Sequence, residues 1–199
     1  MASKPPNILL VTGDEWRADC LGCAGNDILQ TPHVDALASR GTRFTNAYTP
    51  APMCVPARVS ALTGQIPRAH GCLTNGITPT DNVSFVELLR DAGYDTGAFG
   101  KMHFTPRDVP GGFHERVIVE NPTNKNLASG GVDDDWGRFL SLHGIERPND
   151  RNTTDPDWLS KHQGVPWHHE ERFHSDVFIG DSAVAWAENY RGSGPFFLQ

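Results

Sequence analysis

Hydrophobic positions along the first half of the chain change repeatedly between two spacings. Short apolar or alternating runs predict strands, and apolar positions three or four residues apart predict helices. The predicted elements are a strand at Asn7–Thr12, a helix from Thr31 to Gly41, a strand at Thr42–Tyr48, helices at Cys54–Leu62 and Val83–Ala92, and a strand at Tyr94–Phe99. This alternation predicts a three-layer α/β/α fold with a mostly parallel central sheet.

The residues that follow two of these strands are candidates for function. The almost unbroken apolar run Asn7–Thr12 suits a strand buried on both faces, and it leads into Gly13, Asp14 and Glu15. The strand ending at Phe99 leads into Gly100–His103. In parallel α/β sheets ligands bind outside the carboxyl ends of the strands, so we expect a site there.

The second half of the chain has a weaker pattern. Residues 106–171 are rich in Gly, Pro, Asn and Asp, with one short helix from Asp134 to His143, which predicts a loop-rich lid or insertion. Helical spacing returns over Ser175–Tyr190, and Gly194–Gln199 begins another buried strand. Because a domain rarely ends on a core strand, we expect 1–199 to be the N-terminal part of a catalytic domain whose C-terminal part is missing.

Composition excludes several classes of protein. The chain has 17 Lys and Arg against 24 Asp and Glu, a formal charge of −7, which disfavours nucleic-acid binding. Its 38% hydrophobic content suits one globular core. The apolar runs are far shorter than the ~20 residues of a membrane helix, so no membrane partner is expected. The first residues lack the apolar segment of a secretory signal, which predicts a cytoplasmic protein.

Three further groups of side chains allow a functional and a structural interpretation. Cys20 and Cys23 have the spacing of a zinc or redox pair, but no second ligand pair matches them, which favours buried structural thiols. For His168–Glu171 a solvated lid is favoured over a metal cluster, and for Asp133–Asp135 a helix start is favoured. Aromatic side chains that either line a pocket mouth or pack the loops are Trp136, Trp158 and Trp167.

One run of residues is highly specific. Cys54-Val-Pro-Ala-Arg58-Val-Ser-Ala-Leu-Thr-Gly64 resembles the signature of the sulfatase family, Cys-x-Pro-x-Arg followed by Ser and Leu-Thr-Gly. Asn7–Gly25 and Thr31–Tyr48 are similar to the family's first strand with its acidic turn and to the helix and strand after it. Gly100–His103 is similar to its Gly-Lys-Trp-His, with Met102 in place of Trp. The resemblance implies an alkaline-phosphatase-like fold.

The resemblance also implies a catalytic group. A separate maturation enzyme would oxidise Cys54 to Cα-formylglycine, whose hydrated diol attacks sulfate. Arg58 would orient the diol, Lys101 would hold the sulfate oxygens and His103 would take the diol proton. The structural alternatives are a buried thiol at Cys54 and surface positions for Lys101 and His103.

A divalent cation is implied as cofactor. Asp14 and Glu15, with the modified Cys54, would ligate Ca²⁺, or Mg²⁺ or Mn²⁺, because carboxylate oxygens suit hard cations. Glu15 departs from the family's usual Asp or Gln. The structural alternative is a solvated turn or a helix N-cap.

Three functions follow from these observations. The leading one is a sulfuric ester hydrolase acting on a small-molecule sulfate monoester. The second is a phosphonate monoester or phosphodiester hydrolase that uses the same groups. The third is a truncated, non-catalytic fragment, because the family carries a second metal-ligand pair and a further His and Lys in its second half.

Overall fold

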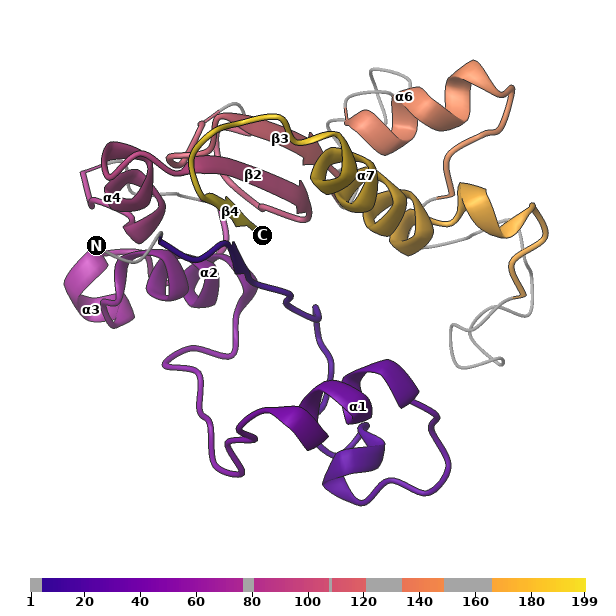
Figure 1. Ribbon diagram of the computed structural model, residues 1–199, viewed down its shortest axis with the longest axis horizontal. Coiled ribbons are helices and arrows are strands. Elements are labelled where there is room, and N and C mark those ends of the chain that lie inside the picture. Colours follow the sequence, from indigo (N-terminus) through magenta and orange to yellow (C-terminus); the bar gives the residue numbers. More distant parts are fainter. Residues whose placement is uncertain (1–4, 77–80, 108, 121–133, 149–165) are drawn as a thin grey trace. The chain divides into compact units, whose positions relative to one another are not determined.

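A computed structural model of the chain describes residues 5–76, 81–107, 109–120, 134–148 and 166–199 (Figure 1). The chain forms two compact units. The larger comprises Met1–Leu10 and Ala51–Gln199, and the smaller is Val11–Pro50. Among the described residues no helix has both the length and the apolar character needed to cross a membrane.

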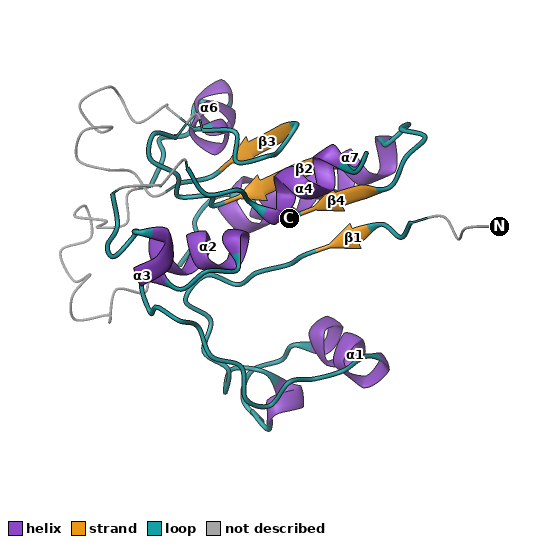
Figure 2. Ribbon diagram, turned by 90° about the vertical axis from the view of Figure 1, so that its left-hand side faces the viewer, coloured by secondary structure: helices purple, strands orange, loops and turns teal. Residues whose placement is uncertain are grey.

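The larger unit is built on a parallel sheet of four strands. Their spatial order is β1-β4-β2-β3, and each neighbouring pair runs in the same direction (Figure 2). The strands are β1 (Ile8–Leu9), β2 (Asp95–Gly100), β3 (Glu115–Ile118) and β4 (Phe196–Leu198). The predicted strands at Tyr94–Phe99 and Gly194–Gln199 are therefore confirmed, and they lie side by side at the centre of the sheet.

Helices pack on both faces of this sheet. Side chains of a strand alternate between faces, so neighbouring residues of β4 contact different helices. Phe197 meets the ring of Phe85 edge-on at 5.3 Å, and Phe196 meets Trp186 at 5.5 Å. These rings belong to α4 and α7. The helices are α2 (Cys54–Thr63), α3 (Pro67–His70), α4 (Phe85–Asp91), α6 (Asp135–Leu142) and α7 (Ser175–Asn189), with a 3₁₀ turn at Glu171–Phe173. The predicted α/β layering is confirmed.

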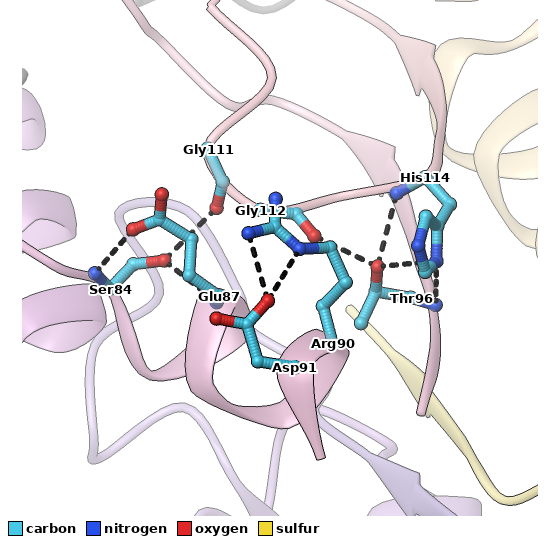
Figure 3. Close-up of polar contacts among 8 residues, drawn as sticks. All are labelled: Ser84, Glu87, Arg90, Asp91, Thr96, Gly111, Gly112 and His114. Atoms are coloured by element: carbon cyan, nitrogen blue, oxygen red, sulfur yellow. Dashed lines mark hydrogen bonds and ion pairs between the residues drawn. The ribbon is translucent and has the colours of Figure 1, made fainter. Parts of the chain in front are cut away.

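Helix α4 begins with a capping box that also anchors the turn before β3 (Figure 3). The amide of Glu87 donates to Ser84 Oγ at 3.1 Å, and the Glu87 carboxylate accepts the Ser84 amide at 2.8 Å. Ser84 Oγ itself donates to the carbonyl of Gly111 at 3.1 Å. Gly112 has φ +94°, and a Cβ there would lie 2.7 Å from the Glu87 nitrogen, so this close approach requires glycine.

The same turn is tied to β2. The fully buried Thr96 hydroxyl donates to the Gly112 carbonyl at 2.9 Å and accepts the amide of His114 at 3.0 Å (Figure 3). These hydrogen bonds hold the residues just before β3 against β2, so that β3 begins next to β2. The interpretation of 106–171 as loop-rich missed this strand, because two of its four residues, Glu115 and Arg116, are charged and its pairing with β2 is not local.

The smaller unit contains α1 (Pro32–Arg40) and a 3₁₀ turn at Gly22–Ala24. Asp35 joins them: its carboxylate accepts the amide of Cys23 at 2.7 Å and the hydroxyl of Thr31 at 3.0 Å. The Cys23 amide, helped by Thr31, holds the pKa of Asp35 below its usual value. The helix predicted from Thr31 to Gly41 is confirmed.

Three expectations near the N-terminus are wrong. The segment Thr42–Tyr48 forms no strand, because its residues are exposed and no described segment pairs with it. The first strand is only Ile8–Leu9 and is not buried on both faces: it pairs on one side with β4, and Leu9 is 64% exposed. Cys20 and Cys23 are free and partly exposed rather than buried.

Candidate active site

Cys54 is the first residue of helix α2. Met53 is the extended N-cap residue, Pro56 falls in the first turn, and Gly64 ends the helix with φ +70°. The side chains of Val55 and Val59 are buried with Cys72 beneath the helix, which fixes its position. The prediction of a helix over this run, closed at Thr63-Gly64, is confirmed.

The backbone at this helix end has a partner that the sequence did not reveal. The amide of Val55 donates to Asn75 Oδ1 at 3.0 Å, and Pro56 has no N–H. The Val55 amide is therefore used within the protein, and Pro56 has none to offer to an anion. The only sequence signal for Asn75 is the turn-forming pair Asn75-Gly76.

Lys101 and His103 follow β2, at the carboxyl end of a central strand. Gly100 and His103 both have positive φ, +111° and +58°. Between Lys101 and His103, Met102 is 4% exposed and belongs to the main core cluster, so the residue that replaces the family's Trp anchors this turn. The Lys101 ammonium lies 3.9 Å from Cys54 Sγ.

Arg58 lies one turn into α2 and also contacts the turn that carries Lys101. Its Nη1 donates to the carbonyl oxygen of Lys101 at 2.6 Å. Cys54, Arg58 and Lys101 are thus brought together by two elements 43 residues apart along the chain. The predicted contact of Arg58 with a diol and the base role of His103 stay predictions.

A buried Ser-His pair connects α2 to α3. Ser60 Oγ and His70 Nε2 are 2.9 Å apart, and His70 Nδ1 accepts the amide of Cys72 at 3.1 Å. With Nδ1 acting as an acceptor, the neutral ring carries its proton on Nε2 and donates to Ser60. His70 is 3% exposed, so the pair connects α2 to α3 as a structural contact rather than as an activated nucleophile.

Asp14 and Glu15 lie in the smaller unit, and both are exposed. Their carboxylates match the donor chemistry of a hard cation, but about six to eight oxygens surround Ca²⁺ in proteins. The described residues contain no group of three or more His, Cys, Asp or Glu placed to hold a metal. Asp14 and Glu15 could therefore supply only part of the ligand shell of a Ca²⁺ ion, and the described residues do not complete it.

The other polar candidates have structural contacts. Asp134 caps α6, accepting the amide of Gly137 at 2.7 Å, which confirms the predicted helix start. His168–Glu171 is exposed and belongs to no metal cluster of the described part of the chain. Trp136 is buried and donates to the Phe173 carbonyl at 2.9 Å, so it packs the loops. Asp133 and Trp158 lie outside the described residues.

A parallel sheet between helices, with charged residues at the carboxyl end of a central strand beside a helix N-terminus, makes the larger unit an α/β domain. The family model described as Sulfatase matches residues 6–199. The chain belongs to the sulfatase family.

Relatives agree with this assignment. The chain is 31% identical to an arylsulfatase of Clostridium perfringens strain 13, over 98% of this chain and 42% of that protein. It is 38% identical to an ulvan-active sulfatase of Formosa agariphila, over 72% of this chain and 31% of the relative. The chain thus spans less than half the length of these relatives.

Two solved structures share the fold. One is a phosphonate monoester hydrolase of Agrobacterium radiobacter, with a TM-score of 0.69 at 23% identity over 98% of this chain and 40% of that chain. The other is a protein solved in complex with its substrate D-glucosamine-2-N,6-O-disulfate, with a TM-score of 0.69 at 24% identity over 98% of this chain and 33% of that chain.

Proposed function

We propose that this chain is the N-terminal part of a sulfuric ester hydrolase that cleaves small-molecule sulfate monoesters through a formylglycine formed from Cys54. The observation that supports it is the placement of Cys54 at the first position of α2, with the Lys101 ammonium 3.9 Å from its sulfur. A reactive group at a helix start beside a fixed cation is suited to attack on an anion.

The chemistry follows from the hydrated aldehyde. In maturation the enzyme that modifies Cys54 uses an external oxidant: the carbon–sulfur bond breaks, the carbon is oxidised by two electrons to an aldehyde, and the sulfur leaves as sulfide. Addition of water then gives a carbon with two hydroxyl groups. One hydroxyl loses its proton and attacks the ester sulfur; the bond from sulfur to the ester oxygen breaks, and the alcohol leaves with a proton. Loss of the second hydroxyl's proton re-forms the aldehyde and expels sulfate. A single alcohol lacks this exit, because its sulfate ester is stable.

The surrounding side chains have complementary roles in this proposal. Lys101 compensates negative charge on the sulfate and on the attacking oxygen. Arg58 holds the Lys101 backbone, and its guanidinium would also orient the diol. His103, in its neutral form, accepts the proton of the second hydroxyl.

We also propose that Asp14 and Glu15 contribute two carboxylate ligands to a divalent cation, Ca²⁺ or else Mg²⁺ or Mn²⁺. The support is their adjacency and their oxygen chemistry. A Ca²⁺ titration of the full-length protein by calorimetry tests this, because the described residues alone do not complete the site. Asp14→Asn is expected to weaken binding, and Asp27→Asn, an exposed acid of the same unit, is the matched control. Equal affinities in the two variants would remove Asp14 from the metal site.

The function is tested in two stages. The chain is co-expressed with a formylglycine-generating enzyme, and the peptide that carries residue 54 is analysed by mass spectrometry. An aldehyde there, with hydrolysis of an aryl sulfate that Cys54→Ala abolishes, supports the proposal. If an aryl phosphonate monoester is hydrolysed faster than the aryl sulfate, the protein is instead a phosphonate monoester hydrolase that uses the same groups. An unmodified thiol and no hydrolysis would indicate a non-catalytic fragment.

A further inference from the structure

A buried carboxylate with no part in the proposed chemistry contacts the turn that carries Lys101 and His103. Glu120 follows β3 and is 7% exposed. A single carboxylate oxygen, Oε1, accepts the amide of Met102 at 2.9 Å and the amide of His103 at 2.5 Å. Two consecutive amides of the candidate catalytic turn thus share one acceptor, 17 and 18 residues further along the chain.

The backbone of Glu120 is itself held at both of its polar groups. Its amide donates to Asp134 Oδ2 at 2.8 Å, and its carbonyl oxygen accepts Nη2 of Arg147. Arg147 also forms a 2.5 Å ion pair with Asp134, in which the two side chains are 8% and 0% exposed. Because these partners are buried and charged, the position from which Glu120 reaches the turn is rigid.

The turn needs such support. His103 adopts φ +58°, a left-handed conformation that a non-glycine residue keeps only when its surroundings enforce it. A buried carboxylate is also unfavourable by itself. Burial raises the pKa of Glu120, while the amides of His103 and Met102 and the positive charges of Arg107 and Arg58 act in the opposite direction. An unfavourable backbone and a desolvated charge therefore occur together at one place, as they do at functional sites.

We propose that Glu120 is a positioning residue: its carboxylate fixes the Met102–His103 backbone so that Lys101 and His103 reach the group formed at Cys54. Arg58 holds the carbonyl of Lys101 and Glu120 holds the two amides that follow, so the turn is held on both sides. The catalytic consequence of this role rests on the proposed function. The support that Glu120 gives to the backbone of the turn rests on the hydrogen bonds alone.

The kinetic test compares three variants of the matured protein. Glu120→Asp withdraws the carboxylate by one methylene, and Glu120→Gln keeps an acceptor oxygen at the original reach. Glu115→Gln, which alters an exposed glutamate of β3 bonded to Trp186, is the control. We expect kcat for an aryl sulfate to fall about 100-fold in Glu120→Asp and less in Glu120→Gln, with KM nearly unchanged, because misplacement of catalytic groups by about 1 Å has that effect. A kcat in both variants equal to that of the control would overturn the proposal.

A second measurement does not depend on activity. In ¹⁵N-labelled wild-type and Glu120→Gln proteins, the amide protons of Met102 and His103 are followed by NMR as the pH is lowered. If Glu120 Oε1 accepts both, their resonances shift together in the wild type, and this shared transition is absent in Glu120→Gln, where only a transition of the His103 imidazole itself would remain. Independent or absent transitions would overturn the positioning role. Failure of the proposed function has a different signature, namely an unmodified residue 54 or an inactive wild-type protein in which these two amides still titrate together.

Discussion

The Lys101 ammonium lies 3.9 Å from Cys54 Sγ, although the two residues are 47 positions apart in the sequence. Cys54 is fixed by the start of α2, and Lys101 by the turn after β2. The buried contacts of Val55 and Met102 support these two elements. The pairing is therefore a consequence of the fold, and it gives position 54 a cationic neighbour before any ligand binds.

The first prediction concerns the second hydroxyl of the proposed diol. Cys54→Ser supplies one hydroxyl, which attacks sulfate but has no second proton to lose, so we expect a stable sulfate ester on the protein and no turnover. Cys54→Ala is expected to be inactive and unmodified. Intact-mass analysis after incubation with an aryl sulfate distinguishes them. Sustained turnover by the serine variant would contradict the diol mechanism, and Cys23→Ala serves as the control.

The second prediction concerns the charge beside position 54. Lys101→Met keeps most of the side-chain volume and removes the ammonium, so we expect kcat to fall by about 10²- to 10³-fold, as when one transition-state donor is removed. Arg68→Met, which removes an exposed cation from α3, is expected to have no such effect. Steady-state kinetics on the matured protein measure both. Activities that fall equally would indicate a general charge effect instead of a local one.

Local signals were sufficient for much of the fold. The Cys54–Leu62 helix could be predicted because proline is tolerated in a first turn and Thr63-Gly64 ends a helix. The last strand could be predicted because Phe196 and its neighbours form a short apolar run after Gly194-Pro195. In both cases the physical cause lies within a few residues of the element, where a sequence pattern records it.

Long-range contacts could not be predicted in this way. The acceptor of the Val55 amide, Asn75, is 20 residues away, and Glu120 reaches back to Met102 and His103 across a strand. The strand at Glu115–Ile118 depends on pairing with β2. Conversely, alternation over Thr42–Tyr48 suggested a strand, but a strand requires a partner, and the described residues supply none there. The two motifs therefore predicted Cys54, Arg58 and Lys101 as candidates, but not Asn75 and Glu120, which contact the same segments.

The third prediction compares two glycines. Gly112 has φ +94°, and a Cβ there would lie 2.7 Å from the amide nitrogen of Glu87; at Gly180, inside α7, an added methyl group would meet no neighbouring segment within 4 Å. Gly112→Ala is expected to lower the free energy of unfolding by about 1–3 kcal/mol. Gly180→Ala is expected to raise it by about 0.5–1 kcal/mol, because alanine loses less entropy in a helix. Urea denaturation measures both, and a stable Gly112→Ala protein would contradict the described packing of the turn on α4.

The last prediction is that the stability of the protein depends on pH through Tyr190, the residue that follows α7. The hydroxyl of Tyr190 donates to Asp95 Oδ2 at 2.7 Å, and this hydrogen bond, with burial and the charge of Asp95, raises the pKa of Tyr190 from 10.0 to about 12. The neutral phenol is the form that the folded state favours. Its contribution to stability is therefore fully present below pH 10 and is lost as the pH rises toward 12.

Tyr190→Phe removes both the bond and the titration. The chain has three tyrosines, Tyr48, Tyr94 and Tyr190, and an ultraviolet pH titration is expected to show a late transition from Tyr190. The late transition should be absent in Tyr190→Phe, and Asp95→Asn should move it to lower pH, because an amide carries no negative charge to oppose ionisation. Stability measured by urea should fall with rising pH in this range more steeply for the wild type than for Tyr190→Phe. If the late transition persists in Tyr190→Phe, it belongs to another tyrosine, and the Tyr190–Asp95 hydrogen bond is not its cause.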